Sequence, residues 1–294
     1  MARTRFTKDA GLSARMGLTM FLNGLIYVVL IAAIWWILGG STGGVVLAVL
    51  LSVGIFWFQW YFSDKVAIKA MGARVVTPEQ APELHSLVDR LCQQADMPKP
   101  QVAFSDTRVP NAFATGRSPE HSVIAVTRGL LDELEPKEVE AVLAHELSHV
   151  AHRDVTVMTI AGVTGIVASL MMRSFLFARG GRNNNGVPIQ LLLMLVGVVV
   201  YALSFVLIRV LSRYRELAAD RAAALLTGSP STLASALVKI SGQTQKMPQK
   251  DLRQTAGASH LAFFNVGSMF STHPSLEKRL AQLDKISNQL STEL

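Results

Sequence analysis

Residues 145–149 read His-Glu-Leu-Ser-His, two histidines four positions apart with a glutamate after the first. Positions i and i+4 lie on one face of a helix, so both imidazoles can reach one metal ion. Glu146 would project near the open position of that ion, where a carboxylate can take a proton from water. Since a five-residue pattern also arises by chance, the elements around it must decide whether it forms a site.

A zinc ion needs a third protein ligand, and residues 212–224 offer two carboxylates on one helical face. Glu216 would bind the metal, and Asp220 would orient a ligating histidine from behind. An ordinary helix held by salt bridges is the alternative, since arginines flank both acids. His152 and Asp154 are competing ligands, and we interpret His152 as a residue behind the ligands or at the boundary of the apolar segment that follows.

The histidine pattern lies on a segment that has the features of a helix. Pro136 is typical of a helix start, because proline lacks the amide hydrogen that a first turn leaves unbonded. Apolar residues then recur at helical spacing and form one stripe: Val139, Val142, Leu143, Leu147 and Val150. We therefore expect the histidines and the glutamate on an amphipathic helix whose other face packs against a core.

Four long segments carry no charged residue: 17–38, 43–62, 155–172 and 188–208. They are 22, 20, 18 and 21 residues long, and about 20 apolar residues in a helix cross a bilayer. The chain is 50% hydrophobic and 17% charged, against roughly a quarter charged in soluble domains. We predict a mostly α integral membrane protein with four transmembrane helices; partial insertion of residues 155–208 is the alternative.

Lysines and arginines near the ends of these segments predict their orientation. The flanks of the first pair carry seven and its linker none: Arg3, Arg5, Lys8, Arg15, Lys65, Lys69 and Arg74. Both ends of the first pair should therefore be cytosolic. The linker of the second pair holds Arg173, Arg179 and Arg182, which oppose the same orientation there.

The apolar segments divide the chain into four parts. We predict an N-terminal transmembrane hairpin (1–62), a cytosolic part with the histidine helix (63–154), a second transmembrane hairpin (155–208) and a cytosolic part with the third ligand (209–294). Residues 77–80 predict a helix start, and residues 100–127 predict a small antiparallel sheet. Residues 276–290 predict a last amphipathic helix capped by Ser275.

Composition excludes some other classes of protein. The net charge of +7 suits nucleic acid or anionic lipid. Because the basic residues lie beside apolar runs and form no separate tract, we expect a lipid bilayer as partner and no nucleic acid. The chain has one cysteine, Cys92, which rules out an internal disulfide and a cysteine-rich zinc cage. We expect Cys92 in the core of an amphipathic helix.

Five features in order resemble the HtpX-type membrane zinc metalloproteases, which share their catalytic core with the CAAX prenyl proteases. They are NAFATG at 111–116, HELSH at 145–149, the hydrophobic hairpin after it, RELAAD at 215–220 and STHPSLEKRL at 271–280. The similarity extends from the first hairpin to Arg279, which is nearly the whole chain. Five ordered matches are far more specific than any one of them.

The resemblance implies a role for each motif. It implies one zinc ion bound by His145, His149 and Glu216, with Glu146 as the base. Asn111, Ala112, Phe113 and Ala114 resemble the edge strand that holds an extended substrate, and His273 and Arg279 resemble residues that line the site, with Arg279 near the zinc glutamate. Pro110 fits an edge because it lacks an amide hydrogen; a plain core strand is the alternative. Without the family, His273 would count as structural.

The expected activity is that of a zinc metalloendopeptidase with a gluzincin-type domain and a small β-sheet. The resemblance implies quality-control proteolysis of misfolded or damaged membrane proteins, as part of a stress response, in a bacterial inner membrane. A CAAX-type processing protease is one alternative. A non-catalytic zinc-bearing membrane adaptor is another, against which the intact Glu146 argues. The oligomeric state is not indicated.

The spacing also predicts where the site lies. If the helices continue, His149 lies about 9 Å from Val155 and Glu216 about 12 Å from Ile208, at 1.5 Å rise per residue. Both ligand helices would then emerge from the bilayer next to the metal. We therefore expect the active site at the cytosolic membrane face.

Overall fold

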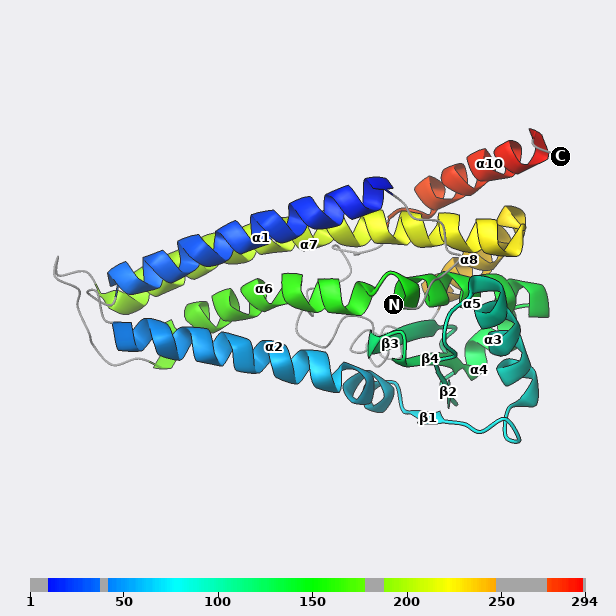
Figure 1. Ribbon diagram of the computed structural model, residues 1–294, viewed down its shortest axis with the longest axis horizontal. Coiled ribbons are helices and arrows are strands. Elements are labelled where there is room, and N and C mark those ends of the chain that lie inside the picture. The colour runs from blue at the N-terminus through cyan, green and yellow to red at the C-terminus, as the bar shows by residue number, and fades with distance from the viewer. Residues whose placement is uncertain (1–9, 38–41, 178–187, 247–273, 293–294) are drawn as a thin grey trace. The chain divides into compact units, whose positions relative to one another are not determined.

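The computed structural model describes residues 10–37, 42–177, 188–246 and 274–292 (Figure 1). The chain divides into two compact units. Unit 1 comprises residues 1–9, 61–156 and 213–294, and unit 2 comprises residues 10–60 and 157–212. Most described residues are helical, and the strands form one small sheet, as the sequence predicts.

The sheet of unit 1 has four strands in the order β1-β2-β4-β3. They are β1 (Ala73–Val75), β2 (Gln101–Ser105), β3 (Ala112–Ser118) and β4 (His121–Thr127). β3 and β4 form an antiparallel hairpin, but β4 also lies beside β2 and runs parallel to it. The predicted antiparallel sheet is therefore wrong in this pairing. Alternating side chains fix which face of a strand is buried, and they do not specify its neighbours.

One face of this sheet shares a buried core with helices α3 (Pro82–Ala95), α4 (Arg128–Glu133), α5 (Pro136–Ala151), α8 (Pro230–Lys246) and α10 (Leu276–Thr292). Their core includes Leu143 of α5, Ile124 of β4 and Leu283 of α10, and Cys92 is buried in it as predicted. The opposite face of the sheet packs against Ile68 near the end of α2 (Thr42–Ala70). The sheet and the core helices therefore fix the backbone of α5.

Helix α5 begins at Pro136, as the sequence predicts. Glu135 and Glu138 form a reciprocal capping box, in which each side chain bonds the other residue's backbone N–H. The buried Glu138 carboxylate also accepts hydrogen bonds from Ser235 at 2.6 Å and Lys239 at 2.8 Å. One carboxylate therefore starts the histidine helix and ties it to α8.

The start of α3 was predicted four residues too early. Thr77 N–H does donate to Gln80 Oε1 at 3.0 Å, but this bond closes a turn, and the helix begins at Pro82. Ala81 has φ −144° and ψ 64°. A residue before proline is kept out of the helical region because its backbone clashes with the proline ring. The helix therefore cannot run through residue 81.

Unit 2 holds most of four long helices: α1 (Ala10–Ile37), α2, α6 (Asp154–Phe177) and α7 (Ile189–Thr227). Leu30 of α1, Ala168 of α6 and Val200 of α7 belong to one buried apolar cluster. Buried Asn23 accepts a hydrogen bond from Thr164 at 2.5 Å. Many large apolar side chains of these helices are exposed, for example Phe21 at 69% and Leu50 at 63%. Such an extended apolar surface is typical of lipid contact.

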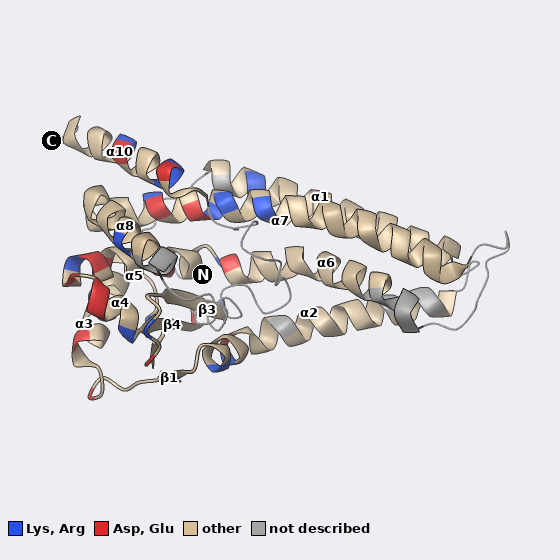
Figure 2. Cartoon of the chain, turned by 180° about the vertical axis from the view of Figure 1, so that it is seen from behind, with Lys and Arg blue, Asp and Glu red and all other residues tan. Residues whose placement is uncertain are grey.

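Two of the four predicted spans stand out in the structure. Ser13–Ile37 and Ile189–Thr227 are long and apolar enough to cross a membrane. Helices α2 and α6 contain the shorter apolar stretches Val49–Phe58 and Asp154–Ser169. Figure 2 shows long parts of α1, α2, α6 and α7 without Lys, Arg, Asp or Glu. The described chain thus has two candidate membrane spans, and four spans remain a prediction.

Glu138→Ala should destabilise the fold. The substitution removes a helix cap and leaves the Ser235 hydroxyl without its acceptor, so we expect a loss of about 2 kcal/mol or more. The melting temperature in detergent, followed by circular dichroism, should fall by several degrees. Glu140→Ala is the matched control on the same helix, since it removes only a partly exposed ion pair with Arg90. Equal melting temperatures for both variants would contradict the role of Glu138.

Candidate active site

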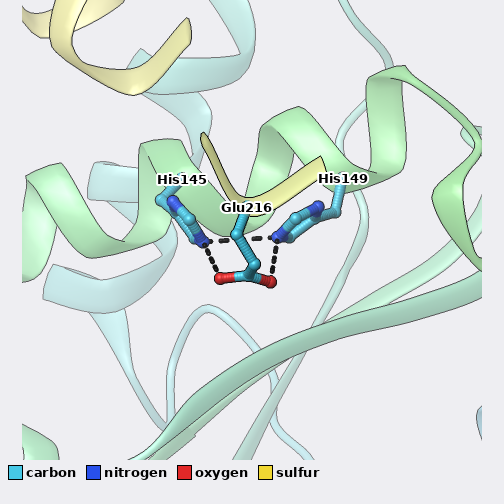
Figure 3. Close-up of side chains that lie close together, drawn as sticks. All are labelled: His145, His149 and Glu216. Atoms are coloured by element: carbon cyan, nitrogen blue, oxygen red, sulfur yellow. Dashed lines mark hydrogen bonds and ion pairs between the residues drawn. The ribbon is translucent and has the colours of Figure 1, made fainter. Parts of the chain in front are cut away.

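Three ligand-type side chains converge between α5 and α7 in unit 1. The Nε2 atoms of His145 and His149 lie 3.3 Å apart. Glu216 Oε2 lies 3.6 Å from His145 Nε2, and Glu216 Oε1 lies 3.6 Å from His149 Nε2. Figure 3 shows both rings directed at the Glu216 carboxylate. Within the described part of the chain, no other three His, Cys, Asp or Glu side chains converge in this way.

This geometry fits a zinc ion. Zinc binds histidine nitrogen at about 2.0–2.1 Å in tetrahedral sites, which places two such nitrogens about 3.3–3.4 Å apart. The observed separation of 3.3 Å between the two Nε2 atoms needs no adjustment. His145 and Glu216 are 6% and 8% exposed, so bulk water competes little for the ion. Two neutral imidazoles and one carboxylate are a known catalytic zinc donor set.

The other ring nitrogen of each histidine faces a carboxylate. His149 Nδ1 forms a hydrogen bond of 2.6 Å with Asp154 Oδ2. His145 Nδ1 lies 3.0 Å from Asp220 Oδ1, which is ion-pair distance without the alignment of a hydrogen bond. A carboxylate at Nδ1 favours the proton there and leaves the Nε2 lone pair for the metal. Both histidines are thus oriented for binding through Nε2.

Each of these carboxylates is bound by an arginine. Arg279 of α10 donates to Asp220 through Nε at 2.7 Å and Nη2 at 2.6 Å, a two-bond contact of high directionality. Its Nη1 also lies 3.7 Å from Glu216 Oε2. Arg215 Nη2 of α7 lies 2.8 Å from Asp154 Oδ2. The ligands are therefore held by a network from four helices.

The acidic neighbours of His145 set its protonation. Burial alone would lower the pKa of His145, but the carboxylates of Asp220 and Glu216 outweigh burial and raise its pKa to about 10. In the metal-free site His145 therefore holds a proton at neutral pH. A metal ion must displace this proton, because only the neutral imidazole has a lone pair for it.

Glu146 lies between the histidines in sequence and faces β3. Its Oε2 accepts a hydrogen bond of 3.2 Å from the backbone N–H of Ala114. Burial of the carboxyl group raises the pKa of Glu146 above its usual value, although the electrostatic effect of the neighbouring histidines lowers it. A carboxyl group with a raised pKa is a stronger proton acceptor than an ordinary glutamate.

The strand that bonds Glu146 lies at an edge of the sheet, since β3 pairs only with β4. Asn111 N–H donates to the Thr127 hydroxyl at 2.9 Å, and Thr127 N–H donates to Asn111 O at 3.0 Å. In an antiparallel pair every second residue faces the partner strand. The backbone of Phe113 therefore faces β4, and that of Ala112 and Ala114 faces the open edge.

The side chains of the NAFATG segment divide in the same way. Ala112 and Ala114 pack against the core that contains α5. Phe113 packs on the other face of the sheet, against Ala103, Val123 and Ala125. Of the four residues that the sequence suggests for substrate binding, Ala112 and Ala114 thus lie on the α5 side of the sheet, Phe113 lies on the opposite side, and Asn111 bonds Thr127 through its backbone; substrate binding stays a prediction.

Two further residues were predicted near the site, His152 behind the ligands or at the boundary of the apolar segment and His273 among the residues that line the site. His152 is the C-cap residue directly after α5, and its Nδ1 donates a hydrogen bond of 2.8 Å to the Ser148 carbonyl oxygen. His273 lies outside the described residues. Asp154, a competing ligand by sequence, instead accepts a hydrogen bond from His149 Nδ1 on the side away from the metal ligands. Arg215, which pairs with Asp154, has no role predicted from the sequence. The position of Arg215 directly before Glu216 was the available signal.

Comparisons with known proteins identify the family. A model described as peptidase family M48 matches residues 78–287. The chain is 51% identical to Protease HtpX homolog 1 of Streptomyces coelicolor over 98% of this chain and 97% of that protein. It is 47% identical to Protease HtpX homolog of Moorella thermoacetica over 98% of each chain. The chain belongs to peptidase family M48.

The resemblance to HtpX-type metalloproteases is thereby confirmed, and the M48 chain is a metallopeptidase whose zinc site is His145, His149 and Glu216. Among solved structures, the crystal structure of S. mikatae Ste24p is similar with a TM-score of 0.54 and 21% identity. The match covers 91% of the M48 chain and 64% of Ste24p, so the chain spans about two thirds of that protein's length. At this identity the likeness shows the fold alone.

Glu216→Ala in this M48 peptidase should lower zinc affinity severely, because it removes a ligand. Asp220→Ala should weaken zinc binding less, by about 10–100-fold, since it acts through His145. Zinc titration of both detergent-purified variants against a competing chelator gives the two constants. Full zinc retention in Glu216→Ala would remove this residue from the ligand set.

Zinc affinity of the M48 site should rise with pH. The pKa of about 10 at His145 means that zinc displaces a proton there at any pH near neutrality. For each proton displaced, the apparent affinity increases by about tenfold per pH unit below that pKa. Zinc titrations at two pH values and direct measurement of proton release test this. Unchanged affinity without proton release would show that the metal-free His145 is already neutral.

Proposed function

We propose that this chain is a zinc-dependent endopeptidase of a bacterial inner membrane that hydrolyses misfolded or damaged membrane proteins. Membership in family M48, the HtpX homologs and the candidate membrane spans support this proposal. The active site faces the cytosol, close to the bilayer, and four helices span the membrane.

The contact between Ala114 N–H and Glu146 Oε2, at 3.2 Å, carries the assignment as a peptidase. It places the open edge of β3 beside the carboxylate and the metal ligands. A protease must hold its substrate extended, and an edge strand does so through backbone hydrogen bonds. Backbone pairing depends little on side chains, which suits an enzyme that acts on many unfolded segments.

Glu146 performs the proton transfers of the reaction. When bound, zinc supplies a Lewis acid that acidifies water and polarises the substrate carbonyl. Glu146 takes the proton of the attacking water and later donates it to the leaving amine. Its raised pKa suits both steps. The Ala114 amide holds the carboxylate in place meanwhile.

The cytosolic placement rests on charge. Seven lysines and arginines flank the first two predicted spans, and their linker has none. Such residues stay on the cytosolic side of a bacterial membrane. Helices α6 and α7 carry Asp154 and Glu216 on the same stretches of chain as their apolar segments, which favours a site near the bilayer.

Glu146→Gln should retain zinc and lose proteolysis, because it removes the base and leaves all three ligands. Zinc content and cleavage of an unfolded membrane-protein substrate are measured on the same preparation. Glu140→Gln, on the same helix, is the control and should keep both. Cleavage by Glu146→Gln at the wild-type rate would contradict the mechanism.

The membrane topology is tested with single cysteines at Ser41, Ser118 and Gly181 in a Cys92→Ser background. An impermeant thiol reagent added to intact cells should label position 41 and, if the second pair of segments spans, position 181. Position 118, on β3, should react only after the membrane is broken. Labelling of position 118 from outside would overturn the cytosolic site, and protection of position 181 would leave a partly inserted second hairpin.

A further inference from the structure

Two charged side chains, Asp154 and Arg215, lie in sequence behind His149. Asp154 Oδ2 accepts a hydrogen bond of 2.6 Å from His149 Nδ1, and the same oxygen lies 2.8 Å from Arg215 Nη2. Asp154 is 2% exposed and Arg215 is 9% exposed. This arrangement therefore lies almost wholly inside unit 1, directly behind a zinc ligand.

The backbone is shaped to produce this contact. Helix α5 ends at Ala151, and Arg153 takes the left-handed conformation with φ 56°. That conformation is uncommon for a residue with a side chain and marks a place where the surrounding structure imposes it. The turn starts α6 at Asp154 and directs its carboxylate back to the ring of His149.

Helix α7 completes the arrangement. Arg215 and Glu216 are adjacent on it, and each acts on a different nitrogen of His149. Glu216 Oε1 lies 3.6 Å from Nε2, whereas Arg215 reaches Nδ1 through Asp154. One helix thereby fixes both sides of the same imidazole.

His145 has an equivalent carboxylate and arginine on its Nδ1 side. Asp220 faces His145 Nδ1 and is bound by Arg279. We propose that Asp154 and Arg215 are a positioning pair for His149, in which Asp154 holds the proton on Nδ1 and Arg215 holds Asp154, so that Nε2 stays directed at the metal. This inference rests on the zinc site at His145, His149 and Glu216.

A contribution to folding alone does not account for the pair. Asp154 Oδ1 and Arg215 Nε are buried, and neither has a hydrogen-bond partner among the described residues. A buried ion pair that leaves polar atoms unsatisfied contributes little to stability, because desolvation offsets the attraction. Asp154 is also not placed to be the third zinc ligand. It contacts Nδ1 of His149, whereas the ligand atoms that converge belong to His145, His149 and Glu216.

The test compares zinc affinity of the full chain in detergent, measured by competition with a chelator. Asp154→Asn keeps the shape and removes the charge, and an amide can also present its NH₂ to Nδ1 and favour the wrong tautomer. We expect zinc to bind about 10–100-fold more weakly, as is typical when a partner of a ligating histidine is lost. Asp106→Asn is the matched control, because it removes an exposed carboxylate that pairs with Arg128, and its zinc affinity should equal that of the wild type.

A double-mutant cycle separates positioning from folding. If Arg215 acts through Asp154, then Asp154→Asn combined with Arg215→Gln should bind zinc no more weakly than Asp154→Asn alone. The visible absorption of the cobalt-loaded protein should change in Asp154→Asn and not in Asp106→Asn. If Asp154→Asn loses helical content, the zinc affinities of Arg215→Gln and Arg215→Lys are compared instead. Arg215→Gln should bind zinc more weakly than the wild type, and Arg215→Lys should recover part of the lost affinity.

If Asp154→Asn binds zinc as tightly as the wild type, the positioning pair is wrong; where Arg215→Gln is used in its place, wild-type affinity in that variant has the same meaning. If the losses of zinc affinity in the two single variants add fully in the double variant, Arg215 does not act through Asp154. These failures leave the zinc site itself standing. If instead the unaltered protein binds no zinc, the proposed enzyme fails together with the inference.

Discussion

The site depends on bringing two imidazole nitrogens to 3.3 Å from one another and facing them with a carboxylate from another helix. Without a metal, such a cluster is unfavourable, since the groups are buried and must share protons. Proton uptake by His145 relieves this cost in the metal-free site, and a divalent cation must displace that proton in order to bind. The surrounding carboxylates and arginines fix the rings so that the nitrogens stay in position.

The rest of unit 1 follows from this requirement. Helix α5 is fixed by its cap, by the sheet and by α8, so His145, Glu146 and His149 have one orientation. The edge strand β3 lies beside α5, and the backbone N–H of its Ala114 donates a hydrogen bond to Glu146. The candidate metal ligands, Glu146 and the open edge of the sheet are therefore brought together by α5 and β3, with Glu216 supplied by α7.

The sequence predicted the candidate ligands and the two helices that carry them because helical spacing translates directly into shared faces, as at His145 and His149 or Glu216 and Asp220. It did not predict the parallel pairing of β2 and β4, because strand alternation carries no information on partners. The start of α3 was missed because Thr77 and Gln80 form a local bond that a helix start also uses. Asp154 was misjudged because a left-handed residue at Arg153 redirects the chain, and no pattern signals that.

The zinc content and the proteolytic activity of the detergent-purified chain, measured on one preparation, test the central claim most directly. The account predicts one zinc ion per chain at His145, His149 and Glu216, loss of zinc and activity together on treatment with a chelator, and recovery of both when zinc is added back. Full activity in chain that contains no metal would contradict it.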